Sequence, residues 1–228
     1  MASTSKKASV LPGRSALAGK PATRHPNHKF NPDGTNPSGA NPDASNPGDG
    51  KPGSSKPGLV FSEMVHLGKL NLRASKSAST QVKSVVGCAF PTAANRFSSA
   101  GERHVVWLCP DEFLIICEAD KDAELASTLE SALKTQHCAV TNITDALAAF
   151  HLKGTAVRQV LAKGCAIDLH PGSFTSGDAA QTLLSHAAVT MLAVADNELI
   201  VICRTSFAPY LHDWLLDAAL EFGVKFNK

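Results

Sequence analysis

The sequence has few of the features on which nucleic-acid-binding and membrane proteins depend. One tyrosine and two tryptophans occur in 228 residues, too few for an aromatic platform on which bases could stack. No run of about 18 apolar residues is present, so no membrane-spanning helix is expected. The amino terminus also lacks the apolar core of a secretory signal. We therefore predict no nucleic-acid partner, no membrane partner and a cytoplasmic location.

Several motifs for cofactors, metals and hydrolytic chemistry are missing as well. The sequence contains no Walker P-loop, no G-x-S-x-G and no H-E-x-x-H. Six cysteines are present without a C-x-x-C pair, the spacing usual for zinc ribbons and iron–sulfur clusters. Cys109, Cys117 and Cys203 lie in or beside apolar runs, where free cysteine behaves as a small buried hydrophobe. We predict reduced thiols, as in cytosolic proteins, and no cofactor-binding or metal-binding residue in this chain.

Charge is unevenly distributed along the chain, although its net value is only +2. Residues 1–58 hold eight basic and three acidic residues, whereas the remainder holds 14 basic and 17 acidic residues. The first segment is therefore net +5 and the remainder net −3. A mildly acidic folded part offers no electrostatic reason to bind nucleic acid.

The first 58 residues have the composition of a disordered tail. They contain nine of the 13 prolines, and Asn-Pro pairs recur every five residues from Asn31 to Pro47. Each Asn-Pro pair disfavours a helix, and few large apolar side chains offset the entropy of ordering the segment. We expect a disordered Asn/Pro/Gly-rich tail over 1–58. A binding tail is the alternative, because the segment carries the basic residues Lys6, Lys7, Arg14, Lys20, Arg24 and Lys29.

Regular elements are predicted beyond a lead-in segment, 59–82, in which no element is assigned. Apolar runs bounded by turn residues predict strands at 85–90, 104–109, 113–117, 139–143, 147–150, 183–195, 199–203 and 224–226. Apolar residues at helical spacing predict helices at 120–136, 155–163 and 206–222. The strand at 113–117 is apolar on both faces, so we expect it at the centre of its sheet. Ser206 is expected to cap the last helix.

An internal repeat links the two halves of the folded part. Residues 111–117 align with 197–203 at an offset of 86 residues, and the elements after each stretch agree in type and spacing. The second half also begins with a strand and a short helix, giving the β-α-β-β-α-β order of a split βαβ unit. We predict an α+β fold of two related ferredoxin-like units, about 83–144 and 145–228, in one compact body over 83–228.

The stretch from Lys163 to Phe174 holds the most reactive-looking residues, Cys165, Asp168 and His170. A cysteine nucleophile needs a base and an oxyanion-stabilising group, which usually come from distant parts of the chain. Cys165 also follows a predicted helix, whereas thiol pKa values are lowered at helix amino termini. We therefore predict a structural joint with no catalytic residue, and keep a cysteine-dependent enzyme as a minor hypothesis.

Four residues remain as candidate contacts to a partner or an anion. Asp168 and His170 lie on the predicted joint, where they can form loop hydrogen bonds or touch another subunit. Arg204 and Thr205 lie where a strand passes into the last helix, a place where backbone N–H groups can hold an anion. Helix capping is the alternative role for this second pair. Addition of His186 to the Cys165 stretch does not complete a metal site, because a clear second pair of ligands is missing.

Three stretches of the folded part carry a family resemblance. The first runs from Trp107 to Ile115, and the second from Lys163 to Phe174 with Gln181-Thr182 after it. The third, from Arg204 to Leu215, contains Arg-Thr-Ser-Phe-Ala-x-Tyr-Leu-x-x-Trp-Leu. They resemble the hairpin, the Leu-x-Lys-Gly-Cys-x-x-Asp-Leu-His-Pro block and the closing strand–helix of the gamma subunit of four-subunit bacterial sarcosine oxidases. Two positions of the hairpin differ from the usual residues, namely Cys109 in place of Gly and Phe113 in place of Trp.

The resemblance implies a fold similar to part of the glycine-cleavage T-protein and a place in a large complex. Such complexes oxidatively demethylate sarcosine to glycine, producing hydrogen peroxide and passing the methyl carbon to tetrahydrofolate. The resemblance implies alpha, beta and delta subunits as partners, with FAD, FMN and NAD in alpha and beta and zinc in delta. We therefore expect a non-catalytic structural subunit of an oxidoreductase. The alternative is a stand-alone tetrahydrofolate-binding or aminomethyltransferase-like protein.

Overall fold

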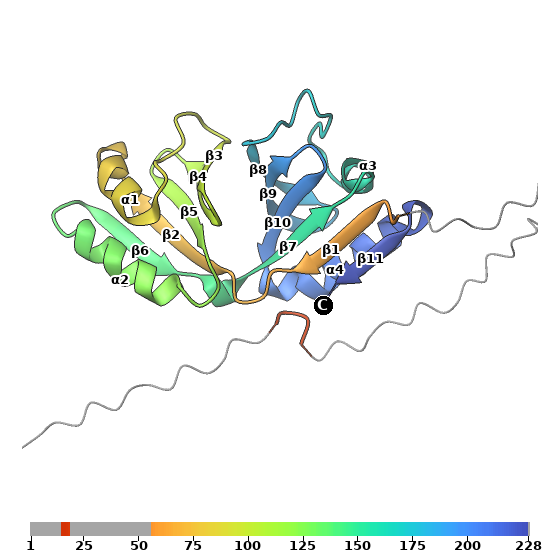
Figure 1. Cartoon of the computed structure of the whole chain (residues 1–228), viewed down its shortest axis with the longest axis horizontal. Coiled ribbons are helices and arrows are strands. Elements are labelled where there is room, and N and C mark those ends of the chain that lie inside the picture. Colours follow the sequence, from red (N-terminus) through yellow and green to blue (C-terminus); the bar gives the residue numbers. More distant parts are fainter. Residues whose placement is uncertain (1–14, 19–55, 228) are drawn as a thin grey trace, which may run out of the picture. The chain divides into compact units, whose positions relative to one another are not determined.

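The computed structural model describes residues 15–18 and 56–227, which form an α+β fold with two sheets (Figure 1). The larger sheet has six strands in the order β11-β1-β7-β10-β9-β8, and the smaller has five in the order β3-β4-β5-β2-β6. The strands of the larger sheet are β1 (Leu59–Glu63), β7 (Leu147–Lys153), β8 (Ala179–Leu184), β9 (Ala187–Ala195), β10 (Glu198–Arg204) and β11 (Val224–Asn227). The strands of the smaller sheet are β2 (Gly68–Ala74), β3 (Phe97–Ala100), β4 (Arg103–Cys109), β5 (Glu112–Cys117) and β6 (Cys138–Asn142).

The same succession of elements occurs twice, as the internal sequence match predicts. It uses four α-helices, α1 (Ser79–Val86), α2 (Asp122–Ala132), α3 (Val157–Ala162) and α4 (Ala208–Ala218). The first unit runs β2-α1-β3-β4-β5-α2-β6, and the second runs β7-α3-β8-β9-β10-α4-β11. The matched strands β5 and β10 each lie between their hairpin partner and the first strand of their unit. The prediction of two related split βαβ units is confirmed.

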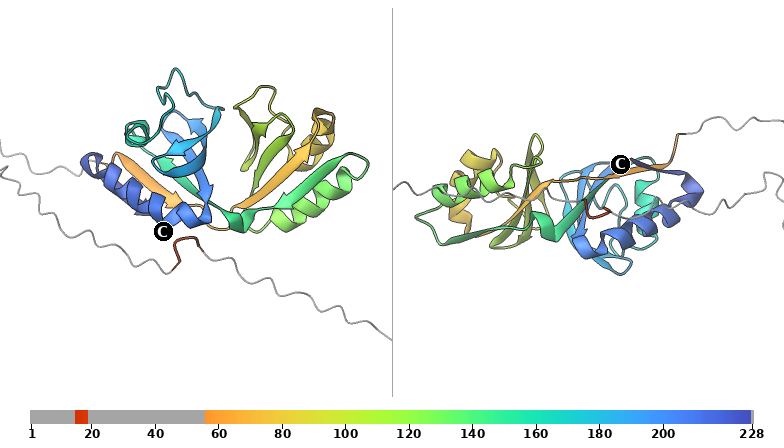
Figure 2. Two further views of the ribbon diagram at one scale, coloured as in Figure 1. Left: turned by 180° about the vertical axis from the view of Figure 1, so that it is seen from behind. Right: turned by 90° about the horizontal axis from the view of Figure 1, so that it is seen from below.

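Each sheet packs one face against its own helices and the other face against the opposite sheet. Figure 2 shows the two sheets with their helices from two further directions. Ile115 of β5 joins the core under α1 and α2, whereas its neighbours Leu114 and Ile116 meet Ile200 and Ile202 of β10 in a core between the sheets. Alternate residues of a strand point to opposite faces. A strand buried on both faces therefore needs the continuous apolar run that the sequence has at β5 and at β10.

The first strand of the chain belongs to the sheet of the second unit. β1 pairs antiparallel with β7 and parallel with β11, in the register Leu59↔Val224, and so lies between the first and last strands of that unit. The chain then enters the smaller sheet as β2, which pairs with β5 and β6. The segment 59–82, in which no element was assigned, thus supplies one strand to each sheet and the beginning of α1.

Two strand predictions are wrong in informative ways. Residues 85–90 were expected to form a strand, but α1 extends to Val86 and ends at Gly87, whose φ is 93°. Its buried face consists of Val82 and Val86. The β-branched pair Val85-Val86 at the end of the helix has a composition typical of a strand. The strand expected over 183–195 is correct for β9, residues 187–195, but residues 183–184 belong to β8 and the hairpin turn lies between the two strands. The turn contains Ser185 at a φ of 53°.

The last helix is shorter than predicted and begins differently. A 3₁₀ turn at Thr205–Phe207 precedes α4, and a second at Leu220–Phe222 follows it. The N-cap position is held by Phe207, without a side-chain hydrogen bond, so the expected capping role of Ser206 is wrong. Pro209 lies in the first turn of α4, where its missing N–H costs no helical hydrogen bond.

Most of the predicted tail lies outside the described residues. Of residues 1–58, the structure describes 15–18, which form a turn, and 56–58, which lead into β1. The prediction of disorder therefore falls on residues beyond the described ranges. Within those ranges, no helix has both the length and the apolar character needed to cross a membrane.

Candidate functional site

The connector from α3 to β8 (residues 163–178) begins with close packing against α4. Lys163 Nζ donates to the carbonyl of Ala218 at 2.5 Å and lies 2.5 Å from a carboxylate oxygen of Glu221. A Cβ placed on Gly164 would lie 2.6 Å from Cζ2 of Trp214, well inside the contact distance of two carbon atoms. The Lys-Gly pair of the reactive-looking stretch is therefore occupied in joining α3 to α4.

The polar residues in the middle of the connector form hydrogen bonds within their own loop. Asp168 Oδ1 accepts the N–H of His170 at 2.9 Å, and His170 Nδ1 accepts the N–H of Gly172 at 3.1 Å. Hydrogen bonds from the Ser173 side chain and the His170 N–H lower the pKa of the Asp168 carboxyl. Asp168 is therefore ionised at neutral pH, and its carboxylate stabilises the loop by accepting these hydrogen bonds. Both Asp168 and His170 are exposed.

Cys165 contributes backbone contacts to the connector, whereas Asp168 and His170 contribute side-chain hydrogen bonds. Its N–H donates to the carbonyl of Leu161 at 3.0 Å, and it forms an isolated antiparallel bridge with Leu184 at the end of β8. The next residue along the hairpin, Ser185, donates its N–H to the carbonyl of Gly164 at 2.7 Å. These backbone contacts fix the β8–β9 turn to the end of α3.

Arg158 of α3 is a structural contributor that no sequence motif marks. Its Nε donates to the carbonyl of Asp196 at 2.7 Å, and Nη1 donates to the carbonyl of Leu169 at 2.7 Å. One guanidinium therefore holds both the connector and the β9–β10 turn. The sequence gives no signal for this role, because both acceptors are backbone carbonyls.

Arg204 and Thr205 lie on a different loop from Asp168 and His170. Arg204 is the exposed last residue of β10, opposite Leu147 of β7. Thr205 Oγ1 donates to the carbonyl of Asp145 at 2.7 Å. The hydrogen bond of Thr205 thus ties the start of the last helical region to the turn before β7, and the four candidate residues do not form one hydrogen-bonded site.

The three sequence stretches that carry the family resemblance are connected by a hydrogen bond and by a close packing contact. Gln181 Nε2, after the connector, donates to the carbonyl of Leu108 in the hairpin stretch at 2.8 Å. The connector reaches the closing helix through the Gly164–Trp214 contact. Residues of these stretches therefore join the first unit to the second and pack the connector against α4.

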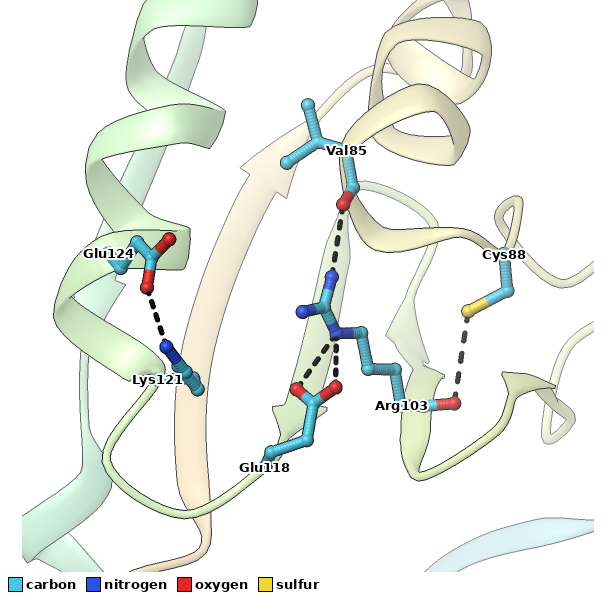
Figure 3. Close-up of polar contacts among 6 residues, drawn as sticks. All are labelled: Val85, Cys88, Arg103, Glu118, Lys121 and Glu124. Carbon is cyan, nitrogen blue, oxygen red and sulfur yellow. Dashed lines mark hydrogen bonds and ion pairs between the residues drawn. The ribbon is translucent and has the colours of Figure 1, made fainter.

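A polar cluster around Arg103 connects α1 to the central hairpin of the first unit (Figure 3). Arg103 Nε lies 2.8 and 3.0 Å from the two carboxylate oxygens of Glu118, and Nη1 donates to the carbonyl of Val85 at 3.2 Å. The hydrogen bond to Arg103 lowers the pKa of the Glu118 carboxyl. Burial raises the pKa of the neighbouring Cys88 thiol. The cluster closes the carboxyl end of α1, where a cation is favoured by the helix dipole.

Burial also shifts the pKa values of two thiols and a lysine elsewhere in the chain. Burial raises the pKa of the Cys117 thiol to about 11 and that of the Cys203 thiol to about 12, so both remain protonated at neutral pH and are poor nucleophiles. Lys69 of β2 is only 3% exposed, donates from Nζ to the carbonyl of Leu67 at 2.5 Å, and has a pKa lowered chiefly by burial.

Two further features of the described residues concern metal ligation and a hollow beside β6. Across residues 15–18 and 56–227, no three His, Cys, Asp or Glu side chains are grouped so that they could hold a metal ion. A hollow of about 560 Å³ lies beside Arg73, Asp111 and His137. Its serine and glutamine side chains bond to one another, as in Ser77 Oγ to Gln136 Oε1 at 3.3 Å.

Known proteins similar to this chain agree on one family. A family model described as the sarcosine oxidase, gamma subunit family matches residues 73–221. The gamma subunit from Corynebacterium sp. (strain P-1) is 36% identical over 119 residues, or 52% of this chain and 58% of that protein. The gamma subunit from Arthrobacter sp. is 30% identical over 168 residues, or 72% of this chain and 82% of that protein.

Solved structures agree with the sequence comparison and with the doubled fold. A chain of the heterotetrameric sarcosine oxidase from Corynebacterium sp. U-96, in complex with pyrrole 2-carboxylate, is similar with a TM-score of 0.67 and 29% identity, over 72% of this chain and 85% of that one. Aminomethyltransferase T of the Bartonella henselae glycine cleavage system shares the fold, with a TM-score of 0.57 and 13% identity, over 75% of this chain and 48% of that enzyme. The predicted resemblance is confirmed: this chain belongs to the sarcosine oxidase gamma subunit family.

Proposed function

We propose that this chain is a non-catalytic structural subunit of a hetero-oligomeric sarcosine oxidase complex. The complex would oxidatively demethylate sarcosine to glycine and form hydrogen peroxide and methylene-tetrahydrofolate. The carrying observation is that the family-like stretches are occupied in packing. Lys163 and Gly164 contact α4, and Gln181 joins the second unit to Leu108 of the first.

The proposal assigns the redox groups to partner subunits. FAD, FMN and NAD would be held by alpha and beta subunits, and zinc by a delta subunit. The described residues do not offer zinc a donor set, because no three potential metal ligands are grouped among them. The thiols of Cys117 and Cys203, with pKa values of about 11 and 12, are also poorly suited to bind zinc as thiolates.

Co-expression tests the structural role. The chain is expressed alone and together with alpha, beta and delta subunits, and each preparation is assayed for oligomeric state, flavin absorbance and peroxide release with sarcosine. We expect a stable four-subunit assembly with activity, and no sarcosine oxidation by the chain alone. Sarcosine oxidation by the isolated chain, or a monomeric chain in the presence of all three partners, would contradict the proposal.

A stand-alone tetrahydrofolate-binding or aminomethyltransferase-like protein is the second candidate. The observation in its favour is the fold shared with aminomethyltransferase T, of which this chain spans 48%. Calorimetry of the isolated chain with tetrahydrofolate separates the candidates. A structural subunit gives no heat of binding, whereas saturable binding by the chain alone would support the second candidate.

A further inference from the structure

A short turn near the amino terminus is attached to the larger sheet at Glu63, the last residue of β1. Ser15 Oγ donates to Glu63 Oε2, and the N–H of Ala16 donates to Glu63 Oε1 at 2.8 Å. Ala16 and Leu17 are partly buried against the apolar core between the larger sheet and its helices. Figure 1 draws this turn in red. A carboxylate and an apolar surface thus hold the same four residues, Ser15–Ala18.

Glu63 supplies the acceptor for one of the three backbone N–H groups of residues 16–18. The N–H of Ala18 donates to the carbonyl of Ser15 at 2.9 Å, and the N–H of Leu17 donates to Ser15 Oγ at 3.0 Å. The N–H of Ala16 has its acceptor outside the turn, in the Glu63 carboxylate. Partly buried backbone donors need such acceptors, so the turn and Glu63 are complementary partners.

Glu63 is well placed to act as a fixed acceptor. Its backbone pairs with Phe150 of β7, and the next residue, Met64, donates its N–H to the carbonyl of Ala149 at 2.8 Å. The carboxylate therefore projects from a strand that is held on its β7 side.

We propose that Ser15–Ala18 is an intramolecular docking motif, and that Glu63 with the adjoining apolar surface is its receptor site. The site recognises a hydroxyl at the first position, an accessible N–H on a small residue at the second, and an aliphatic side chain at the third. The occupant is the chain's own segment. This part of the second unit is therefore covered by the same polypeptide and is closed to other subunits of an assembly.

Amide hydrogen exchange of the full-length chain tests the docking. In the wild-type chain, we expect the N–H groups of residues 16–18 to exchange at least about tenfold more slowly than in an unstructured peptide of the same sequence. Glu63→Ala and Ser15→Ala are expected to remove this protection, because each deletes a hydrogen-bond partner of the turn. Ser15→Thr keeps the hydroxyl and is expected to retain it.

Controls separate release of the motif from unfolding of the body. Glu102→Ala removes an exposed carboxylate from the β3–β4 turn and is expected to leave exchange at residues 16–18 unchanged. Exchange in β10 reports whether each variant keeps its fold. Glu63→Gln, which keeps the side-chain shape, serves if Glu63→Ala alters exchange in β10. Unprotected amides at 16–18 in the wild type, or undiminished protection in folded Glu63 variants, would overturn the proposal.

Discussion

At the scale of single residues, the family-like stretches are explained by space and by hydrogen bonds. Gly164 is small because the ring of Trp214 occupies the place of a side chain, and Lys163 reaches the end of α4 with its ammonium group. Asp168 and His170 instead order their own loop. These residues give the connector its shape, and a structural role accounts for each of these contacts.

Gly164→Ala is predicted to destabilise the chain by about 1–3 kcal/mol, as overpacked sites do. The added methyl group would meet the Trp214 ring at 2.6 Å, so the connector or α4 must shift. Urea unfolding measures the free-energy change. Trp214→Leu is the matched partner: in its background, the cost of Gly164→Ala should fall by more than half. An equal cost in both backgrounds would show that the contact is not responsible.

Burial of Lys69 is predicted to make the stability of the chain depend on pH in the alkaline range. Burial lowers its pKa below the ordinary 10.5 in the folded chain, so the unfolded chain binds more protons between the two values. The free energy of unfolding should therefore rise with pH through this window because of Lys69. Lys69→Met should lose this contribution in urea titrations carried from neutral pH up to pH 10.5.

Exposed Lys134 provides the control for that experiment. Lys134→Met should retain the alkaline rise seen in the wild type, since its ammonium group is solvated in both states. A Lys69→Met chain whose stability follows pH as the wild type does would show that burial of Lys69 does not set the effect.

At the scale of elements, Arg103 is the residue that holds α1 in place. α1 is short and has a modest apolar face, Val82 and Val86, and isolated helices of this length are marginal in water. Arg103 supplies a hydrogen bond to its last turn and an ion pair to Glu118 after β5. Loss of this side chain should therefore loosen α1 before it affects the sheet.

Arg103→Leu is predicted to lower the free energy of unfolding by about 1–2 kcal/mol, a range that allows for solvent screening of a partly exposed pair. Arg73→Leu, at the more exposed pair with Glu112, should cost about 0.5 kcal/mol or less. The lowered pKa of Glu118 also predicts how stability depends on pH. The stabilisation from the Arg103–Glu118 pair is fully present above the ordinary carboxyl pKa and is lost as pH falls through the lowered value. Equal costs for the two arginine variants in urea unfolding at pH 7 would contradict this ranking.

Elements whose pattern is local were predictable from the sequence, and those that depend on distant contacts were not. β5 and β10 carry long apolar runs beside turn residues, and both were predicted within one residue at each end. α1 was missed because the β-branched pair Val85-Val86 at its end is typical of a strand. The β8–β9 turn was missed because Ser185 takes a positive φ without glycine or proline nearby. The split of segment 59–82 between two sheets depends on pairing with β7 and β11, far along the chain.

The candidate site shows the same division. The interpretation of 163–174 as a connector followed from local reasoning about where nucleophiles and bases come from. The partners that explain it, Trp214 and Ala218 of α4, are separated from it by a hairpin and could not be identified by spacing. Arg158 was missed because its acceptors are carbonyl groups, which every residue carries.

At the scale of the whole molecule, the two sheets share a core, so the two units should unfold together. Ile116 and Leu114 pack with Ile200 and Ile202, and β1 and β2 lead from one sheet directly into the other. A shared apolar core without a solvated boundary is typical of a single cooperative unit.

The two tryptophans allow this to be measured, because Trp107 packs in the core of the first unit and Trp214 in that of the second. In Trp107→Phe and Trp214→Phe backgrounds, Ile116→Ala should cost about 2–4 kcal/mol and should shift both fluorescence transitions to lower urea concentration by the same amount. A shift confined to the Trp107 signal would show that the units unfold independently.

The place of β1 also sets the order in which the folded part can be completed as it is made. β1 is synthesised first, yet it pairs with β7, which begins at Leu147, and with β11, which begins at Val224. At about 5–20 residues per second, the interval between Leu59 and Val224 lasts on the order of ten seconds or more. Strands β2 to β6 all end by Asn142 and can pair earlier. In the nascent chain, β1 can pair with β7 first, but its other edge stays unpaired until β11 has been made, and a product shortened before Val224 leaves that edge open.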